Sequence, residues 1–430
     1  MSITQQLQLE RLYRYTVPPG LETPISVATL PNARCRVRTE QEDGPYLVAY
    51  SGPDGILEFS VRPLGESTET ARLYIDAATD GEGTQHAVDL RSTTQPTEKM
   101  PPPPVRARTS QARNGRTIPP LELDDCLGLG DEELFTRGYP PRPSPDLAPG
   151  AFVAWCRFVS TPFTFVEPHL VPRPDLTHTY RSLDGRNRDR SVEPRSLQES
   201  ENWSGFQLMG NPGTYDYVYG NWNVPGGGAG PFNPYTYSSF WVGLDGTGTA
   251  DLIQAGTESD GIVDPSQKVP VCTSVYYAWT CFLPQQWSAQ QIANFPVRIG
   301  DGIQCSVMVA ADENSGPVMG GSFGLFSLAN QRTGQYTRVL TARGSTAVSG
   351  AQTEWIMERP TIQGGHSDLS TYGTATMKFP LAETANPVNW VGYLDANSDQ
   401  LMMVDADGNT LSTVTAVDSD TMQFTWHRYN

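Results

Sequence analysis

Lysine is scarce in this chain. There are three lysines among 430 residues, and Lys plus Arg number 30 against 47 Asp plus Glu, which gives a formal net charge of −17. A nucleic-acid-binding protein needs basic residues to neutralise phosphates, so this balance argues against that class. The scarcity of lysine also argues against a polybasic membrane-binding patch. We expect no nucleic-acid partner.

Long apolar runs are also absent. No stretch approaches the roughly 18 apolar residues that a membrane-spanning helix needs, so we expect no membrane span. Residues 1–20 lack the apolar core and cleavage site of a secretory signal. Residues 1–20 therefore do not indicate where the protein is located.

Cysteine and histidine are too few and too scattered for a metal centre. The six cysteines form no Cys-x-x-Cys pair, and the five histidines do not cluster. Six cysteines in a chain of this length do not make a disulfide scaffold, and they could pair in about 15 ways. We therefore expect no metal and no cofactor.

Glycine and proline are abundant, whereas charged residues make up only 18% of the chain. Long surface helices need Glu, Lys and Ala, so this composition favours strands and turns. Eight of the nine tryptophans lie from Trp203 onward, which separates the chain into parts of different chemistry. We expect a small β-sandwich over residues 1–95, a Pro/Arg-rich linker and candidate propeptide over 96–200, and a third domain over 201–430.

The sequence of the third domain predicts closely spaced β-strands. Apolar and polar residues alternate along several segments, and Asp407-Gly408 between two apolar runs is a hairpin signal. Only residues 288–295 look helical. About ten to fourteen strands in this length predict an all-β fold, a large antiparallel β-sandwich of two packed sheets.

Two short motifs have simpler structural explanations. Residues 320–324 match Gly-x-Ser-x-Gly, but a strand pattern follows where a nucleophile elbow needs a helix. Asp405, Asp407 and Asn409 resemble the start of a calcium loop, but Ala416 stands where that loop needs glutamate. We interpret both motifs as turns.

Gln254 and Glu354 are polar residues inside apolar strands. Alternation puts Glu354 on one face with Ile356, and Trp355 on the other. An ionisable side chain on an apolar strand face is costly unless it is paired or lines a cleft. An edge strand that shows its glutamate to water, with the glutamine bonded to a neighbour, is the simpler explanation of the pattern. The pattern alone leaves both interpretations open.

These residues belong to an ordered series of blocks. The blocks are Asn202-Trp203-Ser204-Gly205, Gly220-Asn221-Trp222-Asn223-Val224-Pro225, Trp241-Val242-Gly243-Leu244-Asp245-Gly246, Leu252-Ile253-Gln254-Ala255-Gly256, Tyr277-Ala278-Trp279 and Glu354-Trp355-Ile356-Met357-Glu358. Six blocks in this order resemble the glutamic peptidase (eqolisin) family over about residues 202–430.

The resemblance implies a lectin-like β-sandwich with a catalytic pair at Gln254 and Glu354. One glutamate can activate water and then protonate the leaving amine. A glutamine amide can stabilise the oxyanion without titrating. The resemblance also implies that Trp241, Asp245 and Trp279 line the substrate cleft, although core packing explains a tryptophan equally well.

The chain departs from the family pattern in its cleft. Cys281 stands where the family has a glutamate, and Leu283 stands where it has a tyrosine, which puts substrate specificity in doubt. The cysteines that fungal members carry before the Gln and Glu blocks are absent, so their disulfide is not expected. Family members are exported proteins with basic propeptides. We hypothesise that part of residues 140–200 covers the acidic cleft by charge complementarity and is removed near the arginine-rich stretch 181–195.

The sequence thus predicts an acid-acting, pepstatin-insensitive glutamic endopeptidase, made as a zymogen, with protein or peptide substrates. Its own N-terminal segment is a candidate inhibitor. The alternative is an inactive lectin-like sandwich that binds peptide or carbohydrate. A third reading is a glycoside hydrolase that uses Glu354 and Glu358, because paired carboxylates suit that chemistry.

Overall fold

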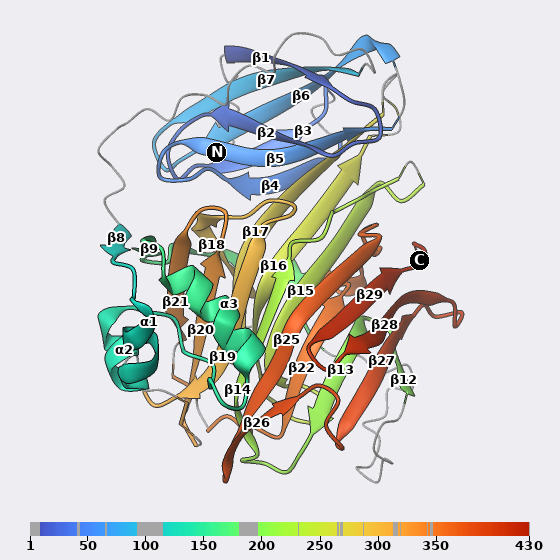
Figure 1. Ribbon diagram of the computed structural model, residues 1–430. Coiled ribbons are helices and arrows are strands. Elements are labelled where there is room, and N and C mark those ends of the chain that lie inside the picture. Colours follow the sequence, from blue (N-terminus) through green and yellow to red (C-terminus); the bar gives the residue numbers. More distant parts are fainter. Residues whose placement is uncertain are drawn as a thin grey trace.

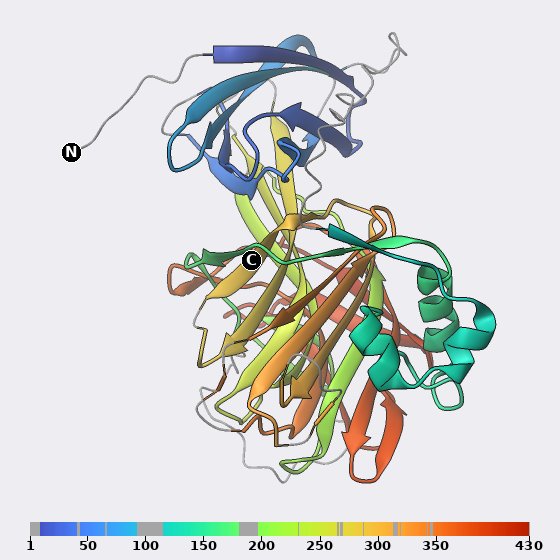
Figure 2. The same cartoon turned by 90° about the vertical axis from the view of Figure 1, so that its left-hand side faces the viewer.

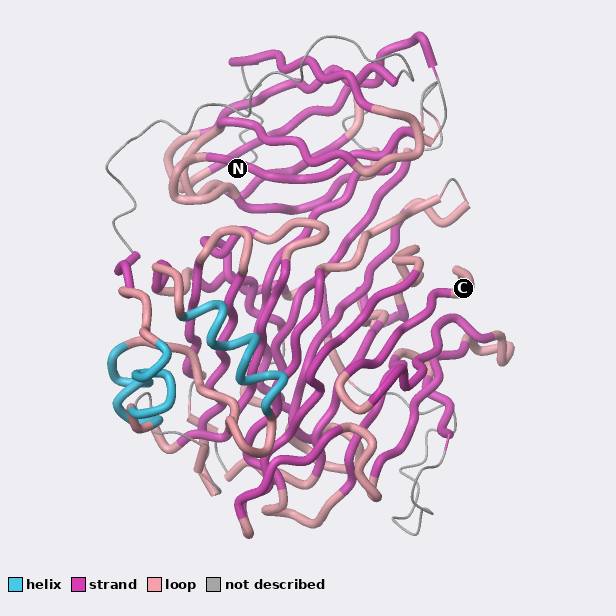
Figure 3. The backbone as a smooth tube through the Cα atoms, in the orientation of Figure 1, coloured by secondary structure: helices cyan, strands magenta, loops and turns pink. Residues whose placement is uncertain are grey.

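The fold is almost entirely β-structure, with a few short helices on one flank (Figure 3). The computed structural model describes residues 9–40, 44–64, 67–92, 115–179, 197–230, 232–264, 266, 270–286, 288–312, 317–318, 320–341, 343–344 and 347–429. The predicted all-β class is confirmed.

Two large β layers, here called sheet I and sheet II, form the body of the molecule (Figure 1). In spatial order, sheet I contains β12 (Leu197–Ser200), β27 (Ser398–Val404), β13 (Trp203–Met209), β22 (Gln352–Glu358), β15 (Tyr235–Asp245), β16 (Leu252–Val263), β17 (Val271–Leu283), β18 (Ala289–Pro296) and β10 (Leu170–Arg173). Sheet II contains β28 (Thr410–Asp418), β29 (Thr421–Trp426), β25 (Thr374–Ala385), β14 (Tyr215–Asn223), β19 (Gly302–Ala310), β20 (Phe323–Asn330), β21 (Gln335–Leu340), β9 (Phe163–Val166) and β8 (Gly115–Ile118), with β26 (Val388–Gly392) beside β25. The hairpin of β27 and β28 joins the two layers into one continuous hydrogen-bonded sheet.

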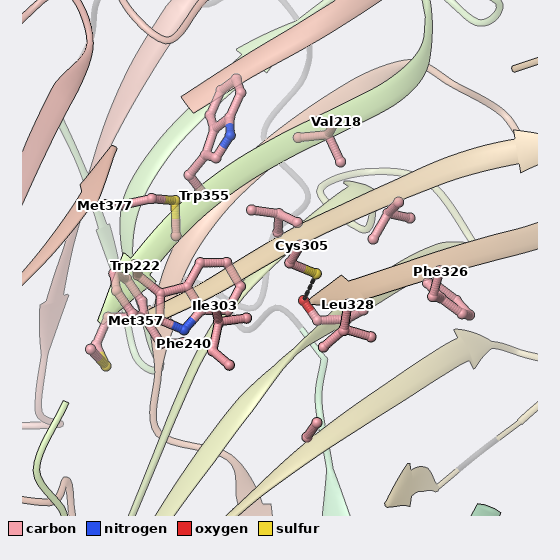
Figure 4. Close-up of a cluster of buried hydrophobic side chains, with 14 of the residues drawn as sticks. Val218, Trp222, Phe240, Ile303, Cys305, Phe326, Leu328, Trp355, Met357 and Met377 are labelled. Atoms are coloured by element: carbon pink, nitrogen blue, oxygen red, sulfur yellow. Dashed lines mark hydrogen bonds between the residues drawn. The ribbon is translucent and has the colours of Figure 1, made fainter. Parts of the chain in front are cut away.

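The two sheets pack face to face through a single apolar core. Trp355 and Phe240 of sheet I meet Met377 and Phe326 of sheet II in this core, and all four are essentially inaccessible to water (Figure 4). Apolar residues recur at every second position in these strands because successive side chains alternate between faces. The predicted antiparallel sandwich is therefore confirmed for the body of the molecule.

A smaller β layer sits at one end of sheet I (Figures 1 and 2). It is a five-stranded sheet of β1 (Leu9–Val17), β7 (Gly83–Ser92), β6 (Ser67–Ala78), β3 (Arg34–Arg38) and β4 (Tyr46–Tyr50). Facing it, β2 (Thr23–Ala28) pairs with β5 (Ile56–Pro63), and β5 pairs in turn with β17. The ends of β16 and β17 thus complete the N-terminal sandwich, and Ile262 and Val275 lie in its core.

Residues 115–179 pass from sheet II to sheet I. The helices α1 (Leu123–Gly128), α2 (Asp131–Arg137) and α3 (Pro149–Val159) lie on the outer face of sheet II. Proline at the first turn of α3 suits a helix start, and apolar residues at helical spacing bury one side of this helix. Beyond β9 and β10, the strand β11 (Leu176–Thr177) pairs with β23 (Thr361–Ile362), which also pairs with β24 (Gly365–His366).

One secondary-structure prediction was wrong. Residues 288–295 were expected to be helical, but residues 289–296 form β18, which pairs with β17 on one side and β10 on the other. Pairing with two strands outweighs the helix propensity of Ala and Gln, because tertiary context routinely overrides intrinsic propensity. The hairpin predicted at Asp407-Gly408 is confirmed between β27 and β28. The proline run 101–104 and the stretch 181–195 lie outside the described residues.

Candidate active site

Strand register brings Gln254 and Glu354 to either side of one glycine. Gly243 of β15 is paired with Glu354 of β22 and with Gln254 of β16. Residues opposite each other in neighbouring strands point to the same face, so no side chain stands between the two. A Cβ added at Gly243 would lie 2.8 Å from Cζ3 of Trp241 and 3.1 Å from Cβ of Gln254. Glycine therefore keeps open the space between the two predicted catalytic residues.

This row faces away from the core between the sheets. Val242, Ala255 and Trp355 belong to that core, so alternation turns Gln254 and Glu354 to the opposite face of sheet I, here called the site face. The site face carries its own apolar cluster, which contains Leu176, Trp203, Trp241, Leu252, Tyr277, Trp279, Cys281, Leu283, Ala289, Ile356 and Leu401. The face assigned to Glu354 and Ile356 from the sequence is the one observed.

Glu354 is completely buried, and neither oxygen of its carboxyl has a hydrogen-bond partner among the described residues. Burial raises the pKa of Glu354 well above its usual value, and the nearby acidic residues Asp245 and Asp251 raise it further. A carboxyl in this environment keeps its proton to a higher pH than an exposed glutamate does. It can therefore act as an acid, and as a base once it has released that proton.

Two aspartates hold the loop that leads into β22. Asp245 accepts hydrogen bonds from the backbone N–H groups of Gly350 and Ala351, at 2.7 and 2.8 Å. Asp251 accepts hydrogen bonds from the backbone N–H and the hydroxyl of Ser349, at 2.6 and 2.7 Å. Burial raises the pKa of Asp245 to about 7. The contacts observed for Asp245 are thus with this loop, and its predicted contact with substrate stays a prediction.

Trp241 and Trp279 lie in one row of the site face, with Gly256 between them. The indole N–H of Trp241 donates a hydrogen bond to Oε2 of Glu358 at 2.9 Å. Trp279 stacks against the imidazole ring of His178, with ring centroids 4.0 Å apart and an angle of 3° between the planes. Both tryptophans are fully buried because another segment of the chain covers them.

The covering segment is residues 176–179. The side-chain amide of Gln254 donates a hydrogen bond to the backbone carbonyl of His178 at 3.0 Å. Nδ1 of His178 lies 3.0 Å from Oε2 of Glu358. The side-chain amide of Asn202 donates to the carbonyl of Thr179 at 2.7 Å and to Oε1 of Glu358 at 3.2 Å. A peptide segment therefore lies directly over Gln254, one of the two predicted catalytic residues.

Arg173, three residues before the covering segment, anchors this part of the chain on sheet I. Its guanidinium lies over the ring of Tyr277, 4.7 Å from the centroid, and it is almost fully buried. Its amino groups lie 2.8 Å from Asp175, 3.8 Å from Asp260 and 3.3 Å from the side-chain oxygen of Gln291. These contacts put a buried cation against the acidic end of β16, near the edge of sheet I.

Sequence reasoning did not single out His178, Arg173 or Asn202 as parts of this site. Asn202 belongs to a resemblance block, but His178 and Arg173 stand in a segment without a recognisable pattern. Cys281, which departs from the family pattern, is paired with Gln254 in the next strand. Burial raises the pKa of its thiol to about 12, so it is a neutral, packed side chain.

Among the residues that the structure describes, no cluster of three or more His, Cys, Asp or Glu side chains could hold a metal ion. None of the helices formed by these residues is long and apolar enough to cross a membrane.

The sequence of the sandwich that carries this site matches a known protein family. The sequence profile of the Peptidase A4 family matches residues 201–426, just over half of the chain. The chain belongs to the peptidase A4 family. The resemblance to glutamic peptidases is thereby confirmed, and peptidase A4 membership makes this protein a hydrolase of peptide bonds. No curated protein matches it.

Solved structures of glutamic peptidases are similar to this peptidase A4 member. Scytalido-glutamic peptidase with a peptide-based transition-state analogue shares 19% identity, covers 53% of this chain and 98% of its own, and gives a TM-score of 0.41. SCP-B, an eqolisin in complex with the tripeptide Ala-Ile-His, shares 18% identity with the same coverage and a TM-score of 0.39.

Proposed function

We propose that this protein is an acid-acting, pepstatin-insensitive glutamic endopeptidase, in which Glu354 is the general acid and base and Gln254 is the oxyanion donor. The observation that carries the proposal is the hydrogen bond from the Gln254 amide to a peptide carbonyl, that of His178. This donor stands across Gly243 from Glu354. Peptide hydrolysis needs this combination: a fixed donor at the carbonyl oxygen and a titratable group beside it.

The reaction follows from these positions. Glu354 in its ionised form removes a proton from water, and the water oxygen attacks the carbonyl carbon. The amide of Gln254 stabilises the negative charge that develops on the carbonyl oxygen. Glu354 then gives its proton to the leaving nitrogen, and the C–N bond breaks. Because the pKa of Glu354 is raised, the same group can hold a proton for the second step.

We also propose that the protein is made as a zymogen, with its N-terminal segment as inhibitor. Residues 176–179 occupy the site face, and Arg173 and His178 lie against Asp260 and Glu358. The ion pair between Arg173 and Asp260 adds to the backbone contacts that hold this segment on the site face. We propose that removal of this segment, by cleavage near residues 181–195, opens the site to protein substrates.

The test is hydrolysis of a denatured protein from about pH 2 to about pH 7, with pepstatin present. We expect hydrolysis by the wild type at acidic pH and none by Glu354→Gln. Gln254→Ala should be slower by about 10²–10³-fold, the usual cost of one oxyanion donor. Glu383→Gln is the matched control, because Glu383 lies in sheet II and also has a raised pKa, about 7.

The rival function is an inactive sandwich that binds peptide or carbohydrate. It predicts no hydrolysis at any pH, either from the full chain or after the segment before residue 202 has been removed. Hydrolysis that survives Glu354→Gln in a folded protein would instead remove Glu354 from the mechanism. Circular dichroism of each variant checks that the fold is retained.

A further inference from the structure

The peptide bond between His178 and Thr179 is held as a substrate bond would be. The carbonyl of His178 accepts the Gln254 amide, and the next carbonyl, that of Thr179, accepts the Asn202 amide. On the other side, Leu176 and Thr177 pair with β23 as a short antiparallel strand. Backbone hydrogen bonds of this kind are the usual way in which an extended peptide binds to a sheet. The bond that follows His178 is thus the one whose carbonyl is held by Gln254, the residue that stands across Gly243 from Glu354.

The side chain of His178 fills a pocket that matches an imidazole ring. Its flat face stacks on Trp279, and its two ring nitrogens face two carboxyl groups. Nδ1 lies 3.0 Å from Glu358, and Nε2 lies 3.9 Å from Oε2 of Glu258. A phenyl ring of similar shape would leave both carboxyl groups facing C–H groups. An imidazole ring can donate from Nδ1 to Glu358, while its Nε2 and the carboxyl of Glu258 face each other without a hydrogen bond among the described residues.

Glu358 is fixed in place independently of His178. Its Oε2 accepts the indole N–H of Trp241 at 2.9 Å, and its Oε1 accepts the amide of Asn202 at 3.2 Å. All three side chains are fully buried. Two donors from sheet I thus orient the carboxylate before any ligand arrives. A preorganised acceptor in a buried pocket is a specificity determinant, because a side chain that cannot donate leaves it without its third partner.

We propose that the site face selects substrates with histidine on the carbonyl side of the scissile bond, and that the first such substrate is the chain's own His178–Thr179 bond. This inference rests on the proposed peptidase function and adds the substrate class to it. In the step, the oxygen of one water molecule bonds to the carbonyl carbon of His178, and the C–N bond to Thr179 breaks. One proton of the water goes through Glu354 to the Thr179 nitrogen. The products are a new carboxyl end at His178 and a new amino end at Thr179.

Self-cleavage is tested on the full chain by mass spectrometry. The protein is purified at neutral pH, moved to about pH 4 and sampled over time. We expect fragments that end at His178 and begin at Thr179, with masses that sum to the intact chain plus one water. Glu354→Gln should give neither. His178→Ala should slow cleavage at this bond at least tenfold, whereas His427→Ala, at an exposed position, should not.

Specificity is tested with peptides of the sequence Leu170–Ser182, in which His178 is kept or replaced by Phe, Gln or Ala. We expect acid-treated wild type to cleave the histidine peptide with a kcat/KM at least tenfold above the others. Glu358→Gln should lower kcat/KM for the histidine peptide at least tenfold more than for the phenylalanine peptide. Glu383→Gln should change neither.

The outcomes separate the two proposals. If the wild type hydrolyses a denatured protein but leaves the His178–Thr179 bond intact, or cleaves all four peptides equally, the histidine preference is overturned and the proposed function stands. If no protein or peptide is hydrolysed at any pH, the proposed function fails and this inference fails with it. A cut confined to residues 181–195 would overturn the assigned bond and keep the zymogen proposal.

Discussion

The carboxylate of Asp245 accepts a hydrogen bond from the backbone N–H of Gly350 at 2.7 Å, which ties the end of β15 to the loop before β22. The other carboxylate oxygen accepts the backbone N–H of Ala351. Glu354 follows three residues later, opposite Gly243 of the same strand β15. Asp245 therefore sets the position of Glu354 indirectly, through the backbone that runs from Gly350 to Glu354.

Replacement of Asp245 by Asn should test this role. The amide of asparagine can accept one of the two N–H groups, but it turns its own NH₂ toward the other. Leaving one buried N–H without an acceptor typically costs about 1–3 kcal/mol, so the free energy of unfolding should fall by about that amount. We also expect the rate of hydrolysis to fall at least tenfold, because catalysis is sensitive to misplacement of about 1 Å.

Asp301→Asn is the matched control for this prediction. Asp301 is equally buried and accepts hydrogen bonds from Arg332 and Asn330 in sheet II, on the other side of the core. Its loss should lower stability without changing the rate per folded molecule. Urea unfolding and initial rates measure the two effects. Equal rates for Asp245→Asn and wild type would show that the loop does not need this clamp.

The sequence predicted the strands of the sandwich because alternation reports directly on a sheet with one buried face. It also predicted the pair Gln254 and Glu354, since each lies in a short block with a recognisable order. Their common row could not be read from pattern alone. It depends on the register of three strands, of which β15 and β16 are consecutive in the chain while β22 follows about one hundred residues later.

His178 shows what local pattern leaves out. Its neighbours in sequence give no sign of a site, and its partners Gln254 and Glu358 lie 76 and 180 residues away. The same limit explains the error at residues 288–295. Their local preference is for helix, but the strands on both sides decide the conformation. Long-range pairing, rather than composition, determines both features.

A methyl group at Gly243 should disable the site. In Gly243→Ala the added Cβ meets Trp241 at 2.8 Å and Gln254 at 3.1 Å, closer than such atoms normally approach. Overpacking of this kind costs about 1–3 kcal/mol of stability, and it pushes Gln254 away from its donor position. We expect the rate of hydrolysis to fall at least tenfold. Gly365→Ala is the control, because its nearest contact would be 3.9 Å away. Similar rates for the two variants would contradict the role of Gly243.

Stability should fall as pH rises from about 4 to about 7. Burial raises the pKa of Asp216 to about 6, and the pKa values of Asp245 and Glu383 to about 7. In the unfolded chain these groups lose their protons near pH 4. Between the two values the folded state binds more protons than the unfolded state, so the free energy of unfolding decreases with pH. Each group contributes at most about 1.4 kcal/mol per pH unit, and less where it is partly exposed.

Urea unfolding of Glu354→Gln at about pH 4, 5.5 and 7 measures this trend without self-cleavage. We expect the free energy of unfolding to be higher at pH 4 than at pH 7 by at least about 2 kcal/mol. Asp175 works in the opposite direction, because Arg173 lowers its pKa, but its contribution is lost only below the range tested. Maximal stability at pH 7 would contradict the raised pKa values.

The N-terminal layer and the catalytic sandwich should unfold together, because strand β17 belongs to both. One end of β17 pairs with β5 of the N-terminal layer, and Trp279, further along the same strand, lies on the site face. Phe59 of β5 is buried in the N-terminal core with Val275 of β17.

Phe59→Ala should cost about 3–5 kcal/mol of stability and lower the temperature at which hydrolysis is lost, although Phe59 is absent from the site. Leu21→Ala, at an exposed position, should leave that temperature unchanged. Circular dichroism and residual activity, recorded on the same heating series, should give coincident transitions, and loss of N-terminal structure with activity intact would show that the two parts are independent.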